Sequence, residues 1–121
     1  MISRICIVNP LAFYKCLADD TRLKSILLIY LEKELCVCEL TEALQVSQPK
    51  VSRHLAQLRE CELLEDRREG QWIFYSLSPS LPAWAREVIQ VTADNNPAYT
   101  KDPHKLLCCM GDRPERKQQC C

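Results

Sequence analysis

A chain of 121 residues that is 47% hydrophobic can form one small domain with its own core. No apolar run approaches the roughly 18 residues of a membrane span, and we identify no secretion signal, so we expect a cytoplasmic protein without a membrane partner. The formal net charge is zero, so a nucleic-acid binder of this composition needs a local basic surface. Nine cysteines, an odd count, indicate thiol ligands or reactive thiols rather than a disulfide framework.

The N-terminal third of the chain has apolar residues at helical spacing. This spacing predicts a first helix over Pro10–Leu17 and a second that opens at Thr21, with Asp20 as its cap. A third, short helix is predicted over residues 36–44.

A turn and a further helix follow directly. Residues 45–47 read as the turn, Ser47 is a natural N-cap, and Pro49 suits a first helical turn. The helix is predicted to run to about residue 59 and to bury Val51, Leu55 and Leu58.

The second half of the chain begins with a predicted β-hairpin. Two strands, 63–68 and 71–77, flank Gly70, which supplies the positive φ of a tight turn. A last amphipathic helix is predicted over 83–92. From residue 94 the prolines, charges and cysteines are typical of a flexible tail. We therefore divide the chain into a folded domain, 1–93, and a tail, 94–121.

Helix, turn, helix and basic hairpin occur in the order of a winged helix-turn-helix domain, a mainly α fold with a small β-hairpin wing. The alternative is a helical domain with a solvated basic face. If the chain is a winged helix-turn-helix domain, the second helix enters the major groove and the hairpin lies near the DNA backbone or minor groove. The candidate DNA contacts are Ser47, Gln48, Lys50, Ser52, Arg53 and His54 on that helix, and Arg67, Arg68 and Gln71 on the hairpin.

Two thiols, Cys36 and Cys38, lie just before the predicted DNA-binding helix in the sequence. Thiolates prefer soft ions over magnesium or calcium. On a regular helix, side chains two positions apart lie about 200° apart, so ligating one ion would bend the backbone. The alternative is that both are ordinary buried side chains, as free cysteines often are.

Four segments resemble the ArsR/SmtB repressors: LADDTRL (17–23), ELCVCEL (34–40), SQPKVSRHL (47–55) and DRREGQW (66–72). Pro82-Ala83-Trp84 extends the likeness toward the arsenical-resistance repressors. The resemblance, over residues 10–92, implies a homodimer that binds double-stranded operator DNA without a cofactor. It further implies release of the DNA when As(III) or Sb(III) binds Cys36 and Cys38.

The chain departs from the arsenical-resistance pattern at Thr41, where a third cysteine is expected. A hydroxide, a small thiol or a tail cysteine would then complete the site, and Cys108 and Cys109 are possible additional ligands. Cys120 and Cys121 form a second adjacent pair. The tail thiols could equally have no binding role. Cys6, Cys16 and Cys61 are more typical of packing residues. Some members of the resembling family hold arsenic near positions 16 and 61, so Cys16 and Cys61 remain an alternative site.

Two other functions compete with metalloid-dependent repression. A regulator of the same fold could sense oxidants through Cys36, Cys38 or the tail cysteines. A cysteine enzyme would need an anion-binding loop or an activating histidine beside its nucleophile. Neither lies near Cys36 or Cys38, so we do not expect an enzyme.

Overall fold

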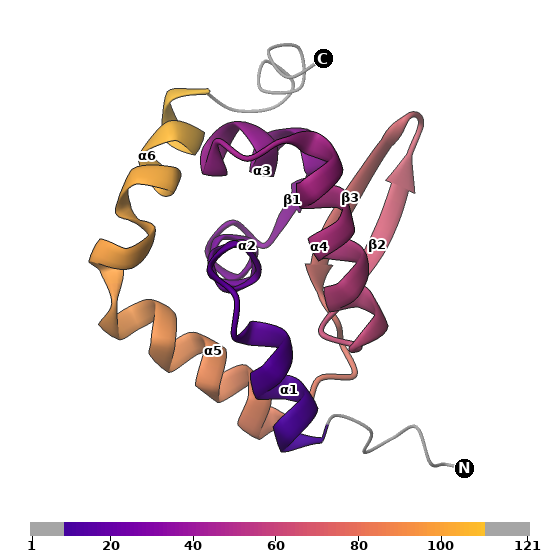
Figure 1. The fold of residues 1–121 in the computed structure, drawn as a ribbon, viewed down its shortest axis with the longest axis vertical. Coiled ribbons are helices and arrows are strands. Elements are labelled where there is room, and N and C mark those ends of the chain that lie inside the picture. The colour runs from indigo at the N-terminus through magenta and orange to yellow at the C-terminus, as the bar shows by residue number, and fades with distance from the viewer. Residues whose placement is uncertain (1–8, 111–121) are drawn as a thin grey trace.

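The structure, a computed structural model, describes residues 9–110. In order, its elements are α1 (Pro10–Leu17), α2 (Asp20–Glu32), β1 (Glu34–Cys36), α3 (Val37–Leu44), α4 (Gln48–Glu60), β2 (Leu64–Glu69), β3 (Trp72–Leu77), α5 (Ala83–Asn95), the 3₁₀ helix η2 (Pro97–Thr100) and α6 (Lys101–Cys109). Figure 1 shows α2 end-on at the centre, with the other helices around it and the β2–β3 hairpin, here called the wing, to one side. The mainly α architecture with a β-hairpin is therefore confirmed.

The first two helices begin at side-chain caps. The Asn9 side chain accepts a hydrogen bond from the backbone N–H of Ala12 at 3.0 Å, and Pro10 follows it in the first turn. The cap of α2 is Asp19, which accepts from the backbone N–H of Arg22 at 3.0 Å. Our prediction of Asp20 as this cap is wrong by one residue, because two consecutive aspartates offer the same chemistry.

Helices α3 and α4 form the predicted helix-turn-helix. Gln45 ends α3 in the left-handed region, with φ of 56°, and its backbone N–H bonds to the carbonyl of Thr41. Ser47 occupies the N-cap position of α4 as predicted, and Pro49 lies in its first turn, although the Ser47 side chain makes no capping bond. The sharp left-handed turn lets α4 leave in a new direction.

The sheet has three strands in the order β1-β3-β2, all antiparallel. Gly70, at φ of 63°, closes the predicted hairpin between Glu69 and Trp72. The short strand β1 was not predicted. Its last residue, Cys36, pairs with Phe74 of β3, so the cysteine segment is attached to the wing.

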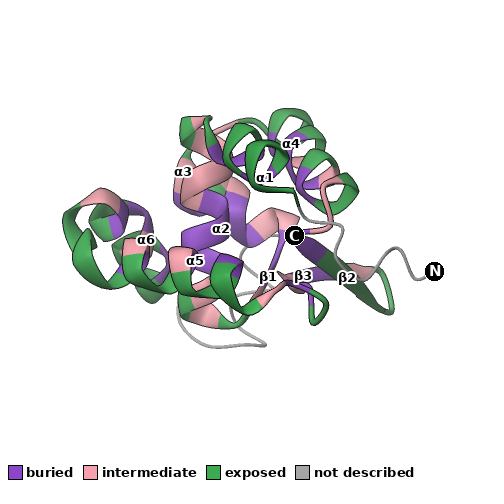
Figure 2. Ribbon diagram, turned by 90° about the horizontal axis from the view of Figure 1, so that it is seen from below, coloured by how far each residue is buried: buried purple, intermediate pink, exposed green. Residues whose placement is uncertain are grey.

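The core is organised around α2. Four consecutive residues of this helix, Ile26 to Ile29, are fully buried, so the helix has no solvent face along this stretch. Figure 2 shows buried positions concentrated along α2 and exposed positions on the outer surfaces of α4, α5 and α6. Each fully buried Leu or Ile stabilises the fold by about 1.5–3 kcal/mol, and α2 therefore fixes the positions of the helices around it.

The prediction of a flexible tail from residue 94 is wrong for the described part of that segment. Helix α5 continues to Asn95, η2 follows, and α6 packs against α3 with Leu107 fully buried. The Tyr99 hydroxyl donates to Asp20 at 2.6 Å, which attaches η2 to the start of α2. Pro97 and Pro103 lie in the first turns of η2 and α6, where a missing N–H costs nothing. No helix in residues 9–110 is both long and apolar enough to cross a membrane.

Candidate nucleic-acid interface and thiol sites

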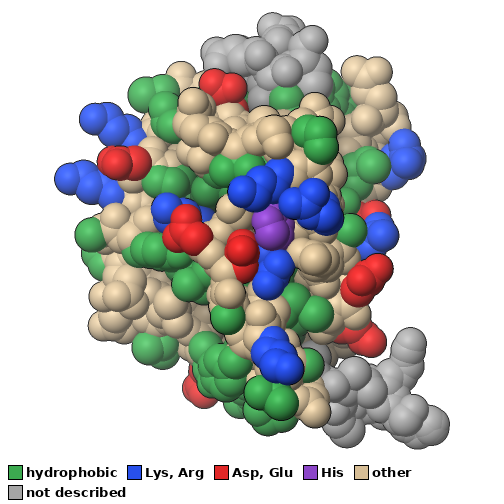
Figure 3. Space-filling view, viewed as in Figure 1, with side chains coloured by type: hydrophobic (Ala, Val, Ile, Leu, Met, Phe, Trp, Pro, Cys, Tyr) green, Lys and Arg blue, Asp and Glu red, His purple; other side chains and the backbone are tan. Residues whose placement is uncertain are grey.

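The outer face of α4 carries most of the predicted base contacts at the surface. Ser47, Gln48, Lys50 and Arg53 are exposed, and Ser52 is half-buried. Val51, Leu55 and Leu58 are fully buried, as predicted, and hold the opposite face of α4 on the core. In Figure 3, Lys and Arg side chains gather around a histidine near the middle of the face, with acidic side chains among them. A chain with no net charge thus presents a local group of cations.

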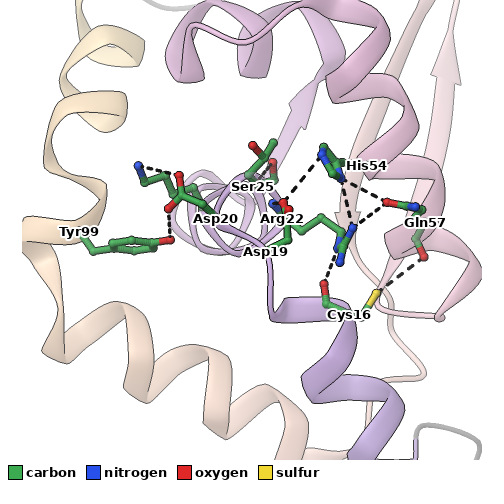
Figure 4. Close-up of polar contacts among 10 residues, drawn as sticks. Cys16, Asp19, Asp20, Arg22, Ser25, His54, Gln57 and Tyr99 are labelled. Atoms are coloured by element: carbon green, nitrogen blue, oxygen red, sulfur yellow. Dashed lines mark hydrogen bonds and ion pairs between the residues drawn. The ribbon is translucent and has the colours of Figure 1, made fainter.

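We predicted that His54 contacts DNA from the surface of α4, but the residue is only 7% exposed. Its Nδ1 lies 3.3 Å from Nη1 of Arg22 and 3.2 Å from Oε1 of Gln57. Its Nε2 lies 3.8 Å from the Asp19 carboxylate. The position flanks the apolar stripe of α4, and the imidazole is turned inward toward α2 (Figure 4). In this position His54 orients α4 rather than reading a base.

Arg22 makes contacts between helices that the sequence did not indicate. Its Nε donates to the carbonyl of Cys16 at 2.6 Å, and its Nη1 donates to Oε1 of Gln57 at 2.8 Å (Figure 4). One guanidinium therefore connects the end of α1, the start of α2 and the C-terminal part of α4. In the sequence, its place in the first turn of α2, three residues after the cap, resembles an ordinary surface position.

The three predicted wing contacts are exposed, but Arg67 already has partners. Its guanidinium bonds to Glu34 at 2.6 Å and to Glu69 at 2.9 Å, and it lies over the Phe74 ring at 4.8 Å. These bonds, foremost the one to Glu34, raise the pKa of Arg67 above its usual value. Arg68 is the more accessible cation for a phosphate, because a phosphate at Arg67 would compete with two carboxylates.

Cys36 and Cys38 line one pocket of about 280 Å³. The expectation that they lie on opposite faces of a helix is wrong, because Cys36 is not helical: it ends β1 and is the N-cap of α3, with φ of −95° and ψ of 166°. The other walls come from α4 and the wing: Gln48, Ser52, Gln71, Trp72, Ile73 and Tyr75. The cysteines thus share a cavity with three of the predicted DNA contacts.

A reciprocal cap holds the start of α3. The Cys36 side chain accepts from the backbone N–H of Glu39, and the buried Glu39 carboxylate accepts from the backbone N–H of Cys36 at 2.9 Å. The helix dipole favours negative charge at this end, and Glu39 supplies it in the first turn. An ion bound to the Cys36 sulfur would share the atom that caps α3.

A third protein ligand beside Cys36 and Cys38 is not evident. The Thr41 hydroxyl donates to the carbonyl of Val37 at 2.8 Å, so it is occupied within α3. Cys108 and Cys109 are exposed near the end of α6. Among residues 9–110, no three His, Cys, Asp or Glu side chains cluster as a metal site would require. Cys6, Cys120 and Cys121 lie outside the described residues.

The alternative pair, Cys16 and Cys61, is brought together by the fold. The two sulfurs are 2.8 Å apart although they are separated by 45 positions in the chain. Burial, and then the hydrogen bond to Cys61, raise the pKa of the Cys16 thiol to about 12. Besides the adjacent pair Cys108 and Cys109 on α6, the described residues thus contain one thiol pair near each end of α4.

An apolar surface lies across α1 and α5. Leu11 is 64% exposed, Tyr14 51%, Trp84 36% and Val91 57%. The buried Phe13 lies beneath this surface and packs edge-on against the rings of both Tyr14 and Trp84. Large side chains of this kind on one face are typical of a protein interface.

Comparisons with known proteins agree with this geometry. Residues 19–66 match the family described as bacterial regulatory protein, arsR family. The arsenic resistance transcriptional regulator ArsR1 of Pseudomonas putida is 50% identical over 114 residues, which cover 94% of this chain and 89% of that protein. The arsenical resistance operon repressor of Escherichia coli is 56% identical over 80 residues, 66% of this chain and 68% of that one. The structure of reduced HlyU from Vibrio cholerae matches with a TM-score of 0.64 at 32% identity, covering 71% of this chain and 86% of that one. On this identity and coverage, the chain belongs to the arsR family of bacterial regulatory proteins.

Proposed function

We propose that this protein is a transcriptional repressor that binds operator DNA as a homodimer and releases it when trivalent arsenic or antimony binds Cys36 and Cys38. The observation that carries the proposal is the pocket shared by the two cysteines, the start of α4 and the wing. The names of the P. putida and E. coli relatives, which refer to arsenic and arsenical resistance, support the choice of ion. The protein needs no cofactor to bind DNA and has no catalytic role.

DNA reading in this proposal rests on the exposed end of α4. Arg53 can bond two acceptors of a guanine, and Gln48 can bond an adenine in the same way. Ser47, Ser52 and Lys50 hold phosphates or base edges, while Arg68 and Gln71 of the wing contact the backbone or minor groove. Because the chain has no net charge, affinity depends on this local group of side chains.

Release of DNA follows from the position of the inducer pocket. Gln48 and Ser52 form one wall and Gln71 another, so an ion held by the cysteines lies behind side chains proposed to face DNA. Ligation draws the Cys36 sulfur away from its capping role on α3 and pulls on β1, which pairs with β3. The ion thus changes the relative position of α4 and the wing, the two elements that must fit the duplex together.

The inducer is held by two protein thiolates and one exogenous ligand. This composition is supported by the occupied Thr41 hydroxyl and by the absence of a three-residue cluster within residues 9–110. Soft trivalent ions prefer thiolates, so hydroxide or a small thiol completes their coordination. Cys108 and Cys109 act at most as auxiliary ligands.

The test uses a duplex selected by the reduced full-length protein from a random DNA library. Fluorescence anisotropy then measures DNA release by arsenite and antimonite, with zinc and cadmium as comparison ions. Cys36→Ser and Cys38→Ser should bind the duplex like the wild type but need at least tenfold more arsenite for release. Serine preserves the side-chain shape and removes the soft donor.

Two matched controls separate the thiol sites. Cys61→Ser and the double variant Cys108→Ser/Cys109→Ser should keep the arsenite response of the wild type. If Cys61→Ser loses the response and Cys36→Ser keeps it, the inducer site lies between α1 and α4. A wild type that selects no duplex, or that stays bound in both arsenite and antimonite, contradicts the proposed function.

A further inference from the structure

The Cys16 and Cys61 sulfurs form a close contact between two helices. Cys16 lies in the last turn of α1, and Cys61 is the residue that ends α4. Their sulfurs are 2.8 Å apart, and an S–S bond requires about 2.05 Å, so less than an ångström of movement separates the thiols from a disulfide. The contact faces an open pocket of about 360 Å³ on the protein surface, wide enough for a small oxidant.

The two sulfurs differ in environment. Cys16 is buried, and burial followed by its hydrogen bond with Cys61 raises its pKa to about 12, so it remains a thiol at neutral pH. Cys61 is half-buried and accepts the Cys16 S–H. Lys15, Arg22 and Glu60 also line the pocket, so charges of both signs surround it, and the two thiols differ chiefly in their exposure to solvent. Cys61 is therefore the sulfur that reacts first, and Cys16 is the partner that closes the bond.

We propose that Cys16 and Cys61 are a redox-active pair that hydrogen peroxide oxidises to an intrachain disulfide, a modification site separate from Cys36 and Cys38. The Cys61 thiolate attacks one peroxide oxygen, the O–O bond breaks, and a sulfenic acid forms while hydroxide leaves and takes up the Cys61 proton as water. The Cys16 sulfur then attacks the Cys61 sulfur, the S–O bond breaks, and the Cys16 proton leaves with the hydroxide as a second water. Two thiols and one peroxide thus give one disulfide and two waters.

Oxidation fixes α4 in the position that it already has. The Cys16 thiol also lies 3.8 Å from the carbonyl of Gln57, and the backbone of Cys16 is bonded to Arg22, which in turn holds Gln57. A covalent bond added here reinforces an existing connection between α1 and α4 without a large displacement. We therefore expect the oxidised protein to keep its DNA-binding geometry and to unfold at a higher temperature, because the bond closes a loop of 45 positions.

The test is peptide mapping of the full-length protein after a peroxide titration. Remaining thiols are blocked with N-ethylmaleimide, and trypsin releases residues 16–22 and 60–67, each with a single cysteine. The expected product is the linked pair of these two peptides, formed equally in wild type and in the Cys36→Ser/Cys38→Ser variant. Cys36 and Cys38 share the separate peptide 34–50, so a bond between them is distinguished by mass.

Cys61→Ser is the matched variant, because it changes the more exposed sulfur and leaves the buried one in place. It should lose the linked peptides and the rise in melting temperature, which in the wild type should be on the order of 5 °C. If Cys61 is alkylated, over-oxidised or linked to other cysteines before the 16–22/60–67 pair appears, the proposal is wrong. A tenfold loss of DNA affinity on forming this bond alone would overturn its role in fixing α4. The mapping needs no DNA, so its result is independent of the proposed repressor function.

Discussion

Arg22, at the start of α2, donates to the Gln57 side chain of α4 at 2.8 Å, across 35 positions of the sequence. The same guanidinium bonds the carbonyl of Cys16 and lies beside His54. The angle of the recognition helix α4 is thus set by a polar contact with the core helix as well as by apolar packing. This contact is the basis of the first prediction.

Arg22→Lys should lower both the free energy of unfolding and the affinity for DNA. A single ammonium cannot bond the three acceptors that the planar guanidinium spans, and a hydrogen bond to a charged group contributes about 1.5–3 kcal/mol. Chemical denaturation and anisotropy measure the two effects. Lys24→Ala is the control on the same helix: the half-buried Lys24 pairs with the exposed Asp20 at 3.3 Å and lies over the Tyr99 ring at 5.2 Å, contacts that should together be worth about 1 kcal/mol. Equal effects of the two substitutions would contradict the role of Arg22.

Arg53→Ala should weaken binding to the selected duplex by about 1–3 kcal/mol and relax the preference at one base pair, without a change in melting temperature. Arg53 is exposed on α4, so its loss removes no packing. Arg68→Ala, on the wing, should instead weaken all duplexes alike and lower the dependence of affinity on salt. The measurement is anisotropy at several salt concentrations. Unchanged binding by Arg53→Ala would mean that a different face of α4 meets DNA.

Asp19 should contribute to the loss of stability in acid. The backbone N–H of Arg22, bonded to its carboxylate, lowers the pKa of Asp19 below the ordinary value, so the charged form is favoured in the folded state. This stability is present above the unfolded pKa of about 3.9 and disappears as pH falls through the lower folded value. Asp19→Asn, which can still cap α2, should flatten the decline of unfolding free energy below about pH 4. Asp94→Asn, at an exposed position on α5, is the control and should leave the decline as in the wild type.

The capping role of Cys36 predicts different outcomes for two small substitutions. Cys36→Ser retains an acceptor for the backbone N–H of Glu39, whereas Cys36→Ala removes it. The alanine variant should be less stable than the serine variant by about 1 kcal/mol, in addition to any loss of packing. Thermal unfolding of the reduced proteins measures the difference. Equal stability of the two variants would show that the sulfur does not hold the start of α3.

Leu11→Glu should convert the proposed dimer into a monomer. Leu11 is the most exposed large apolar side chain of the surface on α1 and α5, and burying a charge in an interface without a partner is costly. Sedimentation at micromolar concentration should give a dimer for the wild type and a monomer for the variant. Leu106→Glu, at an exposed position on α6, is the control and should leave the dimer intact. A monomeric wild type would contradict the homodimer.

Elements defined by local patterns could be predicted from the sequence, and those defined by distant contacts could not. Val51, Leu55 and Leu58 identify α4 through their spacing, and Gly70 identifies the hairpin turn. Strand β1 has three residues, and its partner in β3 lies about forty positions away, so no local signal marks it.

The same distinction applies to α6 and to the candidate sites. Leu107 is buried because α3 lies beside it, a contact that the sequence does not show. The prolines and charges of the segment from residue 94 instead favoured a prediction of flexible chain over α6. A division of the chain into a folded domain and a tail at residue 94 therefore cuts through packed structure. The sequence shows that Cys36 and Cys38 are two positions apart, but it could not show their common pocket, which depends on the extended backbone of Cys36.

The placement of the two tryptophans of this chain provides a spectroscopic means of separating its two proposed binding events. Trp72 lines the pocket of Cys36 and Cys38, whereas Trp84 belongs to the apolar surface on α1 and α5. In a Trp84→Phe protein, the intrinsic emission comes from the inducer pocket alone, and a heavy ion bound there should quench it. In a Trp72→Phe protein, the tryptophan emission reports whether the surface around Trp84 is exposed to solvent or covered by a second subunit.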